Sequence, residues 1–408
     1  MTKVIIDEKL VDEFLERGVA EIFPDRETFK KKLLSGEKIR VYCGFDPSAP
    51  SLHIGNAILI NKLAELQKLG HEVIFLIGDF TGMIGDPTDK TAARKKLTRE
   101  EVLENAKNYQ KEAAAYLFFD KDNPATIKYN SEWNDKLGFR DLIEVASNFT
   151  AQQMFARDMF QERVKNEKPI YLHEFLYPLA QAYDSVAMDV DLEIGGNDQM
   201  FNMLCGRDLM RAMKNKEKFV LTMKLLADNE GKKMGKSEGN VVWLSDSPEN
   251  MYGKVMSWPD GVIGIGFELC TNIPFGEVKE TYKKMEDGET NPRDLKMKLA
   301  YEITKINHGE EKAKEAEDYF VRTIQKKEIP DEVKEIIIEK ELSLIDFLVL
   351  SELATSKSDA RRKIEQGGVY LENNNSLEAM ISDRVLNKDD NEKIIKVGKK
   401  NFRKIIFE

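Results

Sequence analysis

The sequence is poor in cysteine, in long apolar runs and in net positive charge, and each shortage excludes a class of protein. Its three cysteines, Cys43, Cys205 and Cys270, lie far apart, without a CxxC pair or a Cys/His cluster. Neither a disulfide framework nor a zinc ribbon is therefore expected. The longest strongly apolar run, residues 73–77, is far shorter than the roughly 18–20 residues that cross a bilayer. The N-terminal residues form no apolar signal segment. These features predict a cytoplasmic protein without a membrane segment.

The charge balance is acidic, since 62 Lys and Arg against 72 Asp and Glu give a formal net charge of −10. Bulk charge therefore gives no support to a protein that coats nucleic acid or an anionic membrane, although it leaves room for a local basic patch. The chain has 408 residues, of which 33% are charged and 41% hydrophobic. This length and composition are typical of a folded protein with two or three domains.

Residues 38–78 carry the clearest structural pattern. Residues 38–46 alternate in polarity as a strand does, and residues 53–69 repeat apolar side chains at helical spacing. Residues 72–78 are nearly all apolar, as buried parallel strands are. A strand, a helix and a strand in succession form a βαβ unit. The sequence therefore predicts an α/β fold with a doubly wound parallel sheet, Rossmann-like in type.

The rest of the chain is mostly helical in pattern and changes character again near residue 341. Helices are expected at 98–119, 141–164, 248–256, 291–307 and 310–325. Beyond them, two short helices and a turn-rich strand region indicate a small α+β domain. We therefore predict three domains: 1–240 with a helical insertion around 120–170, an α-helical domain at 241–337, and a small α+β domain at 338–408.

The motif His-Ile-Gly-Asn at residues 53–56 opens the first predicted helix directly after a strand. A helix N-terminus offers free N–H groups and a partial positive charge, which attract phosphate. His53 and Asn56 add hydrogen-bond donors for a phosphoryl group in its transition state, and Gly55 lets a flat base approach the backbone. An ordinary helix start with a surface histidine explains the same motif when it is taken alone.

A second motif, Lys-Lys-Met-Gly-Lys-Ser at residues 232–237, lies far downstream. Lys233 and Lys236 are three apart on a glycine-bearing segment. Such a segment suits a loop that folds over a triphosphate and neutralises charge that grows in the transition state. A solvated basic turn is the alternative, since most lysine runs are of that kind.

The two motifs together resemble the signatures of class I aminoacyl-tRNA synthetases. The blocks between and around them are similar, in the same order, to those of the bacterial tyrosyl-tRNA synthetase family: YCGFDPSAPSLHIG, FTGMIGDPTDK, FLYPLAQAYD, IGGNDQ and a tail like an S4 RNA-binding domain. The resemblance covers essentially the whole chain. It implies an ATP-dependent ligase that forms tyrosyl-adenylate and pyrophosphate from L-tyrosine, and then transfers tyrosine to the 3′-terminal adenosine of tRNA(Tyr).

The resemblance also implies partners and domain roles. Mg²⁺ would be carried with ATP and pyrophosphate, and no residue is expected to hold a resident metal ion. The family is homodimeric, and the Met- and Phe-rich residues 141–164 suit part of an interface, although the same stripe also suits a core. The helical domain would meet the anticodon, and the S4-like domain would meet the long variable arm of the tRNA.

Residues of the tyrosine pocket follow from the matched blocks. Tyr42 and Asp184 match the pair that holds the phenolic hydroxyl, which donates one hydrogen bond and accepts another. Asp86, Tyr177 and Gln181 match the group around the α-ammonium, where one carboxylate and two neutral acceptors suit a cation.

The spacing of the last of these residues is informative by itself. Tyr177 and Gln181 are four apart and Asp184 follows three later, so the three share one helical face. An amphipathic helix with a polar edge has the same spacing. Pro178 suggests that this helix begins near it, because proline is tolerated in a first turn.

The remaining assignments are also implied by the family. The expected catalytic residues are His53, Asn56, Lys233 and Lys236. Gln199 joins the tyrosine site, and ATP is expected at Asp46, Ser48, Gly55, Gly196, Asp198 and Lys236. Contacts with tRNA are expected from Lys90, Arg94, Lys357, Arg361 and Arg362. The chain departs from the family pattern at Asn56, Asp89 and Gly235, which replace a common histidine, glycine and serine.

Two alternatives stay open on the sequence alone. One is another enzyme of the superfamily, such as a tryptophan-specific synthetase or an HxGH nucleotidyltransferase. The Tyr42 and Asp184 pair argues against it, because that pair suits a phenol. The other is a non-catalytic paralogue that has kept RNA binding. The presence of His53, Lys233 and Lys236 argues against this second alternative.

Overall fold

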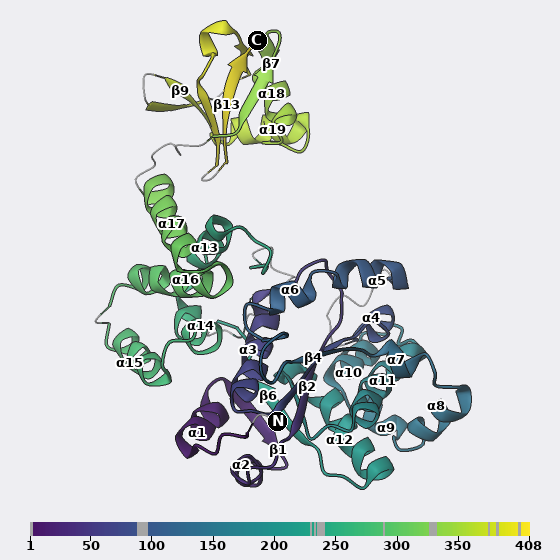
Figure 1. The fold of residues 1–408 in the computed structure, drawn as a ribbon. Coiled ribbons are helices and arrows are strands. Elements are labelled where there is room, and N and C mark those ends of the chain that lie inside the picture. The colour runs from purple at the N-terminus through teal and green to yellow at the C-terminus, as the bar shows by residue number, and fades with distance from the viewer. Residues whose placement is uncertain are drawn as a thin grey trace. The chain divides into compact units, whose positions relative to one another are not determined.

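The computed structural model describes residues 3–87, 97–228, 231, 234, 241–288, 290–325, 333–373, 376–380, 383–398 and 401–408. The contacts within the chain divide it into two compact units, Met1–Ala313 and Lys314–Glu408 (Figure 1). No helix in the described ranges combines the length and the apolar character that crossing a bilayer requires.

The first unit is built on a mixed sheet with the strand order β1-β6-β5-β2-β3-β4. Its strands are β1 (Val19–Phe23), β2 (Arg40–Phe45), β3 (Glu72–Ile77), β4 (Thr126–Tyr129), β5 (Leu192–Gly196) and β6 (Phe219–Met223). Strands β2 to β6 pair in parallel, whereas β1 runs antiparallel to β6 at the edge. The predicted parallel sheet is therefore mostly parallel, because the N-terminal strand is added in the opposite direction.

Helices cover this sheet and continue beyond it, and the last of them, Glu310–Phe320, spans the boundary between the two units. They are α1 (Glu8–Glu16), α2 (Arg26–Leu34), α3 (Ile54–Lys68), α4 (Thr81–Ile84), α5 (Arg99–Ala106), α6 (Tyr109–Ala113), α7 (Ser131–Asn134), α8 (Phe139–Ala146), α9 (Ala151–Phe155), α10 (Asp158–Lys165), α11 (Leu172–Met188), α12 (Met200–Lys214), α13 (Pro248–Met256), α14 (Ile263–Cys270), α15 (Phe275–Glu286), α16 (Pro292–His308) and α17 (Glu310–Phe320), with 3₁₀ turns at Asn197–Gln199 and Asp260–Val262 and a π turn at Val321–Gln325.

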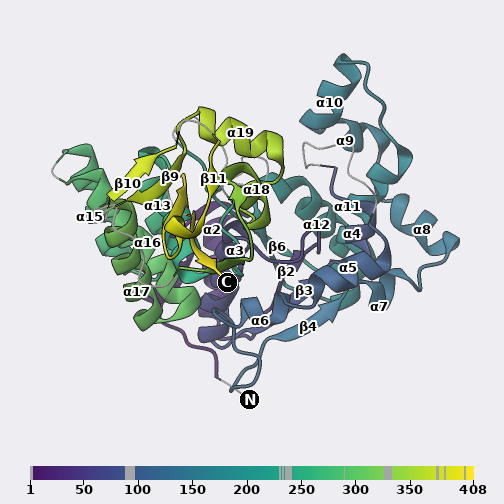
Figure 2. The same cartoon turned by 90° about the horizontal axis from the view of Figure 1, so that it is seen from above.

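The strand order changes direction between β2 and β5. Strands β3 and β4 continue from β2 on one side, with α3 crossing from β2 to β3, whereas β6 lies on the other side of β5 and is reached through α12. Figure 1 and Figure 2 show α3 on one face of the sheet and α11 with α12 on the other. In open α/β sheets, ligands bind at the carboxyl ends of the strands where the order reverses.

The βαβ unit predicted at 38–78 is confirmed as β2, α3 and β3. Gly70 follows the cap of α3 and has a φ of 92°. A Cβ atom at Gly70 would lie 2.6 Å from the backbone oxygen of Lys3. Only glycine combines this left-handed conformation with so close an approach.

Three predicted helices differ from the observed ones. Residues 98–119 are divided between α5 and α6, and no helix continues to residue 119. Residues 141–164 are divided among α8, α9 and α10, because Thr150 and Gln153 form a reciprocal capping box that starts a new helix within the stretch. The expectation that the helix carrying Tyr177 begins near Pro178 is wrong, since α11 begins at Leu172 and contains that proline. Its start is fixed instead by Glu174, whose carboxylate accepts from the backbone N–H of Tyr171 at 2.8 Å.

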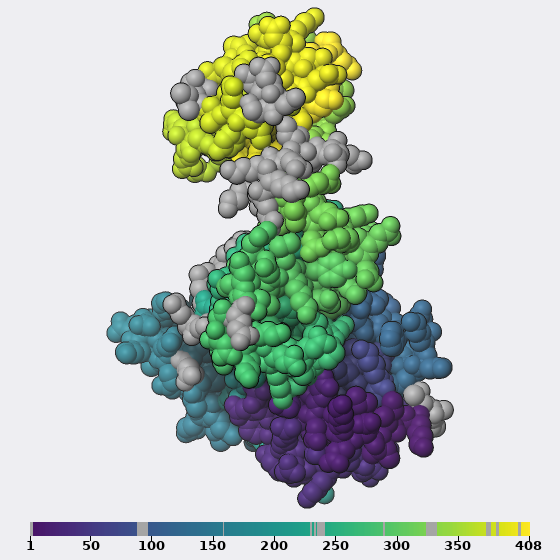
Figure 3. All heavy atoms as spheres, turned by 90° about the vertical axis from the view of Figure 1, so that its left-hand side faces the viewer, coloured from purple at the N-terminus to yellow at the C-terminus, as the bar shows by residue number. Residues whose placement is uncertain are grey.

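The N-terminal segment is tied to the helices that follow the sheet. The Arg17 guanidinium donates to the carbonyl oxygens of Glu268 at 2.9 Å and Ile273 at 2.8 Å, near the end of α14. Lys279 of α15 lies 2.6 Å from the Glu16 carboxylate. Figure 3 shows the purple N-terminal atoms directly against the green helices of this unit. The carbonyl groups at a helix C-terminus lack partners within the helix, so the arginine satisfies acceptors that need one.

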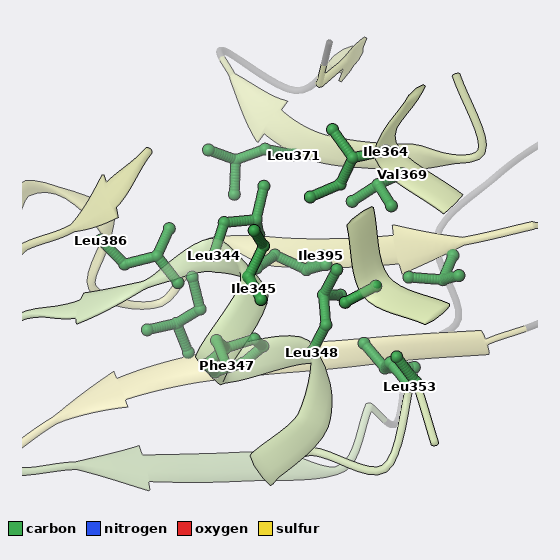
Figure 4. Packing of buried hydrophobic residues seen from close by; sticks show 14 of the residues in the cluster. Leu344, Ile345, Phe347, Leu348, Leu353, Ile364, Val369, Leu371, Leu386 and Ile395 are labelled. Atoms are coloured by element: carbon green, nitrogen blue, oxygen red, sulfur yellow. The ribbon is translucent and has the colours of Figure 1, made fainter. Parts of the chain in front are cut away.

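The second unit is a small α+β domain, as predicted in outline. Its sheet has the order β10-β9-β12-β13-β7, and β11 pairs with β8. The elements are β7 (Glu335–Ile338), β8 (Leu342–Ser343), α18 (Leu344–Leu350), α19 (Lys357–Glu365), β9 (Val369–Asn373), β10 (Ser376–Ala379), β11 (Val385–Leu386), a 3₁₀ turn at Lys388–Asp390, β12 (Ile394–Val397) and β13 (Asn401–Phe407). Leu344, Phe347 and Leu348 of α18 pack with Leu371 and Ile395 from the sheet (Figure 4).

Candidate functional site

The buried hydroxyl of Tyr42 lies near the point where the strand order reverses. Tyr42 lies on β2 with no exposed surface, and its hydroxyl oxygen is 3.0 Å from Oγ of Ser185 on α11. Burial raises the pKa of Tyr42 well above its ordinary value, and the negative charges of Glu193 and Asp184 raise it further. This hydroxyl therefore keeps its proton and is a hydrogen-bond donor at neutral pH.

The Asp184 carboxylate lies one residue before Ser185 on α11 and is 2% exposed. It accepts hydrogen bonds from the Trp133 indole N–H at 2.7 Å, from Nδ2 of Asn134 at 3.1 Å and from Nδ2 of Asn130 at 3.2 Å. Burial raises the pKa of Asp184, and these three hydrogen bonds act in the opposite direction. Trp133, Asn130 and Asn134 are not predictable from the sequence, because they belong to no motif and lie about 50 residues from Asp184.

Asp46 follows β2 directly and holds Tyr177 and Thr81. The Tyr177 hydroxyl donates to Oδ2 of Asp46 at 2.8 Å, and the Thr81 hydroxyl donates to Oδ1 at 2.7 Å. Gly78 makes room for this arrangement, since a Cβ atom there would lie 2.0 Å from Oδ1 of Asp46. The structure therefore joins Tyr177, predicted beside the α-ammonium, to Asp46, predicted beside the ribose.

The other predicted residues of the ammonium group have different partners. Asp86 accepts from Nε2 of Gln199 at 2.6 Å, which brings together two residues of the predicted tyrosine site. Gln181 of α11 donates to Oε1 of Glu193 on β5 at 3.0 Å. Carboxylates therefore lie beside the neutral side chains of this group, and the charge of one of them, Glu193, is balanced by Lys218.

His53 and Asn56 form a reciprocal cap at the start of α3. Nδ1 of His53 accepts from the backbone N–H of Asn56 at 3.3 Å, and Oδ1 of Asn56 accepts from the backbone N–H of His53 at 3.0 Å. Since Nδ1 is the acceptor, a neutral His53 carries its proton on Nε2. The Asn56 amide keeps its N–H₂ group as a donor. Gly55 lies under the imidazole, where a Cβ atom would come within 3.0 Å of Cε1 of His53.

The remaining predicted ATP residues lie in two turns. The backbone N–H of Ser48 donates to the Asp46 carbonyl at 2.7 Å in the turn after β2. Gly196 ends β5 and Asp198 follows in a 3₁₀ turn. A Cβ atom at Gly196 would lie 2.6 Å from Oδ1 of Asp198, so only glycine lets this carboxylate fold back over the strand end.

The basic residues of the prediction fall into two groups. Lys357, Arg361 and Arg362 are exposed on α19 of the second unit. Lys357 lies 2.6 Å from Asp346, and Arg362 lies 2.6 Å from Asp359. The others lie outside the described residues, namely Lys90, Arg94, Lys233 and Lys236, together with the family departures Asp89 and Gly235.

Comparison with known families identifies the class of protein. Residues 34–325 match the family of class I tRNA synthetases for tryptophan and tyrosine. Residues 325–405 match the C-terminal domain family of SYY-like tyrosine–tRNA ligases. The chain therefore belongs to the class I aminoacyl-tRNA synthetases.

The similarity to individual relatives narrows this class to one activity. The chain is 45% identical over 392 residues to the tyrosine–tRNA ligase of Thermotoga maritima, covering 96% of both chains. It is 40% identical over 394 residues to that of Aquifex aeolicus, covering 96% of this chain and 97% of the relative. The activity is that of a tyrosine–tRNA ligase, which implies the use of ATP.

Solved structures agree on the fold. The structure of tyrosyl-tRNA synthetase from Archaeoglobus fulgidus, complexed with L-tyrosine, covers 76% of this chain and all of its own with a TM-score of 0.60 at 22% identity. A C-terminally truncated mitochondrial tyrosyl-tRNA synthetase from Aspergillus nidulans covers 76% of this chain and 92% of its own with a TM-score of 0.64 at 21% identity. These likenesses show a tyrosyl-tRNA synthetase fold.

Proposed function

We propose that Tyr42 and Asp184 read the phenolic hydroxyl of L-tyrosine. The supporting observation is the chemistry of this buried pair: Tyr42 is a protonated donor, and Asp184 is an acceptor held by three hydrogen bonds. A phenol that donates to Asp184 and accepts from Tyr42 satisfies both groups. Phenylalanine leaves both unpaired in a buried site, and such a loss gives strong discrimination.

The amino end of the substrate is assigned to Asp86, Tyr177 and Gln181, with Gln199 beside Asp86. The Tyr177 hydroxyl donates to Asp46 and Gln199 donates to Asp86, so two carboxylates lie beside the neutral side chains of this group. An ammonium group beside them gains oxygen acceptors. The acids and neutral oxygens together compensate the buried cation.

The first chemical step joins the tyrosine carboxylate to ATP. A carboxylate oxygen attacks the α-phosphorus in line, and the bond from the α-phosphorus to the bridging oxygen of the β-phosphate breaks. Tyrosyl-adenylate forms, and pyrophosphate leaves with the Mg²⁺ that entered with ATP. The protein forms no covalent bond with the substrate, so its contribution is positioning and electrostatic stabilisation.

The donors for this step are assigned to the two signature motifs. His53 offers its Nε2–H, since its Nδ1 accepts the capping hydrogen bond, and Asn56 offers its N–H₂ group. Lys233 and Lys236 neutralise charge on the departing pyrophosphate. The nucleotide itself is assigned to the turns that carry Asp46, Ser48, Gly55, Gly196 and Asp198. In the second step, a ribose hydroxyl of the terminal adenosine of tRNA(Tyr) attacks the activated carbonyl and displaces AMP.

The finer description of the fold supports these roles. The α/β part is proposed to be a Rossmann-like doubly wound domain at 1–240, since helices lie on both faces and the strand order reverses between β2 and β5. Residues 241–337 are proposed as the anticodon-binding domain and 338–408 as an S4-like domain. Lys357, Arg361 and Arg362 project from α19 and suit contacts with RNA phosphates, and Lys90 and Arg94 are assigned to the acceptor end. The proposed place of this activity is the cytoplasm.

We also propose a homodimer whose interface includes α8 and the first turn of α11. Several large apolar side chains are exposed there: Phe139 is 80% exposed, Ile143 55% and Leu172 83%. Figure 1 and Figure 2 both show α8 at the outer edge of its unit. Exposed apolar patches of this kind mark interaction surfaces. The pair of variants Phe139→Glu and Leu172→Glu is expected to shift sedimentation toward the monomer.

The chemistry is tested by ATP–pyrophosphate exchange in the absence of tRNA, with tyrosine and with tryptophan. Exchange with tyrosine and not with tryptophan supports the assignment and excludes the rival synthetase specificity. Lys233→Ala and Lys236→Ala are expected to slow adenylate formation far more than they weaken tyrosine binding. The reverse pattern would remove the two lysines from the chemical step.

A further inference from the structure

A buried ion pair lies behind the tyrosine pocket. Lys218, directly before β6, and Glu193 on β5 form an ion pair in which the lysine side chain is fully buried and the glutamate side chain is 3% exposed. The Lys218 ammonium also donates to Oγ of Ser185 at 2.8 Å and to the Met203 carbonyl at 3.2 Å. The three protons of the ammonium group therefore have three acceptors.

This ion pair touches both parts of the proposed tyrosine site. Ser185, one of its partners, lies 3.0 Å from the hydroxyl of Tyr42. The second oxygen of Glu193 accepts from Gln181 at 3.0 Å. Lys218 therefore contacts Tyr42 through Ser185, and Glu193 contacts Gln181 directly. Tyr42 is proposed to bind the phenol and Gln181 the ammonium group.

The packing leaves room for this network. Gly206 of α12 faces it, and a Cβ atom there would lie 2.5 Å from Nζ of Lys218 and 2.9 Å from Oγ of Ser185. An apolar pair of similar size would cost less free energy to bury than these two charges. A glycine in the middle of a helix and a buried ion pair are both unfavourable for stability alone, so their combination points to function.

The direction of the hydrogen bond between Ser185 and Tyr42 follows from the donors and acceptors around Ser185. Ser185 has no exposed surface, and its oxygen already accepts from Lys218. In the part of the chain that the structure describes, the only other hydrogen-bond partner of its hydroxyl is the hydroxyl of Tyr42. A buried hydroxyl proton needs an acceptor. Ser185 therefore donates to Tyr42, and the proton of Tyr42 is directed elsewhere.

We infer that Lys218 is a positioning residue for tyrosine recognition, which acts through Ser185 so that Tyr42 presents its hydroxyl proton to the phenolic oxygen of the substrate. The inference rests on the proposed role of Tyr42. Lys218 also pairs with the carboxylate of Glu193, whose negative charge raises the pKa of Tyr42. With the lysine in place, Glu193 is a weaker competitor for the Tyr42 proton. A cation therefore sets the direction of the hydrogen bond that reads the substrate.

Two variants cut this chain of contacts at different points. Ser185→Ala removes the hydroxyl and keeps the ion pair, so it leaves no buried charge unpaired. Lys218→Met combined with Glu193→Gln removes both charges together and avoids an isolated buried carboxylate. Lys216→Met is the matched control, because Lys216 lies on the same turn but pairs with Asp191 at 2.9 Å.

The readout is ATP–pyrophosphate exchange by the full-length protein, with tyrosine and with phenylalanine as substrates. For Ser185→Ala and for the double variant, we expect the KM for tyrosine to rise and the preference for tyrosine over phenylalanine to fall, each by about three- to tenfold, the value of one hydrogen bond. The kcat with tyrosine and the KM for ATP should stay near the wild-type values. Lys216→Met should change none of these quantities.

A purely structural role would lower kcat/KM for both amino acids by the same factor, and this result would overturn the inference. An unchanged preference for tyrosine over phenylalanine in both variants would overturn it as well. Tyr42→Phe separates the inference from the proposed function. If Tyr42→Phe lowers the preference and Ser185→Ala does not, only the role of Lys218 and Ser185 fails. If Tyr42→Phe leaves the preference unchanged, both the proposed pocket and its positioning residue fail.

Discussion

Asn56 and His53 cap the helix α3 reciprocally, each through a side-chain acceptor and a backbone N–H. The cap uses Nδ1 of the imidazole and Oδ1 of the amide, which leaves the donors of both side chains for other partners. In both residues, therefore, the acceptor atoms serve the helix cap and the donor groups are those proposed to act in the chemistry. A substitution can therefore remove the donor of a side chain and keep its capping acceptor.

Asn56→Asp is expected to keep the cap and lose the donors. Aspartate is as good a helix cap acceptor as asparagine, so the free energy of unfolding should change by less than about 1 kcal/mol. Loss of one donor to the transition state typically slows a reaction by about 10²–10³. Single-turnover adenylate formation measures this effect, and Asn56→Ala, which loses the cap as well, is the comparison. Adenylate formation at the wild-type rate in Asn56→Asp would exclude Asn56 from the chemistry.

Trp133 supports Asp184 through its indole N–H, which donates at 2.7 Å. Trp133→Phe removes this donor, so the pKa of Asp184 should rise further and the acceptor for the phenol should be less firmly held. We expect the KM for tyrosine to rise by about three- to tenfold, as for the loss of one hydrogen bond.

Trp258→Phe is the matched control for this change. Trp258 is buried, whereas Trp133 is partly buried, and within the described residues the Trp258 indole nitrogen has no hydrogen-bond partner. The same substitution there removes no hydrogen bond and should leave the KM for tyrosine unchanged. Equal effects of the two variants would mean that loss of ring volume, not the contact with Asp184, is responsible.

Gly206→Ala tests whether the space around Lys218 is needed. Alanine in a helix interior is usually more favourable than glycine by about 1 kcal/mol. At Gly206 the added methyl group would meet the Lys218 ammonium at 2.5 Å, so we expect a loss of stability in chemical denaturation and a higher KM for tyrosine. Gly276→Ala on α15, where a Cβ atom meets nothing within 4 Å, should be neutral or stabilising. A stabilising Gly206→Ala with an unchanged KM would contradict the packing argument.

The burial of His71 is expected to make the folded protein less stable in mild acid. This residue is 1% exposed, and burial lowers its pKa from 6.5 to about 4, with the charge of nearby Lys38 adding to the effect. Between these two values the unfolded chain binds a proton that the folded chain does not. Stability is therefore complete above about pH 6.5 and falls as the pH drops toward 4.

Because of His71, the free energy of unfolding is expected to fall by about 2 kcal/mol between pH 7 and pH 5. Chemical denaturation at the two pH values measures the total change, and His71→Asn isolates the part due to this residue. Asparagine keeps an acceptor for the Ile39 N–H, which donates to Nδ1 of His71 at 3.4 Å, and has no titrating group. The same pH dependence in the wild type and His71→Asn would show that other groups are responsible.

The sequence predicts the local structure well where the pattern is dense. The unit β2, α3 and β3 was expected from alternation, helical spacing and a nearly continuous apolar strand. The antiparallel edge strand β1 was not, because its partner β6 is about 200 residues away and its own five residues carry little pattern. Pro178 suggested a start for α11 that is wrong, because a proline removes only one hydrogen bond and the buried face of the helix keeps α11 continuous.

The candidate site divides in the same way. Residues within the family motifs, such as Tyr42, Asp184 and His53, were identified by their order along the chain. Trp133, Ser185 and Lys218 belong to no motif, and their roles depend on contacts across the fold. Such contacts are fixed by packing and by the pairing of buried polar groups, which a single sequence does not display.

The most direct test of the account is the ratio of kcat/KM for tyrosine to that for phenylalanine in ATP–pyrophosphate exchange, measured for the wild type and for Tyr42→Phe. Tyrosyl-tRNA synthetases are themselves the standard example of such discrimination, at about 10⁵-fold without editing. We expect strong preference for tyrosine in the wild type and a ratio at least about tenfold lower in Tyr42→Phe. An equal ratio in the two proteins would contradict the claim that this buried hydroxyl reads the phenol.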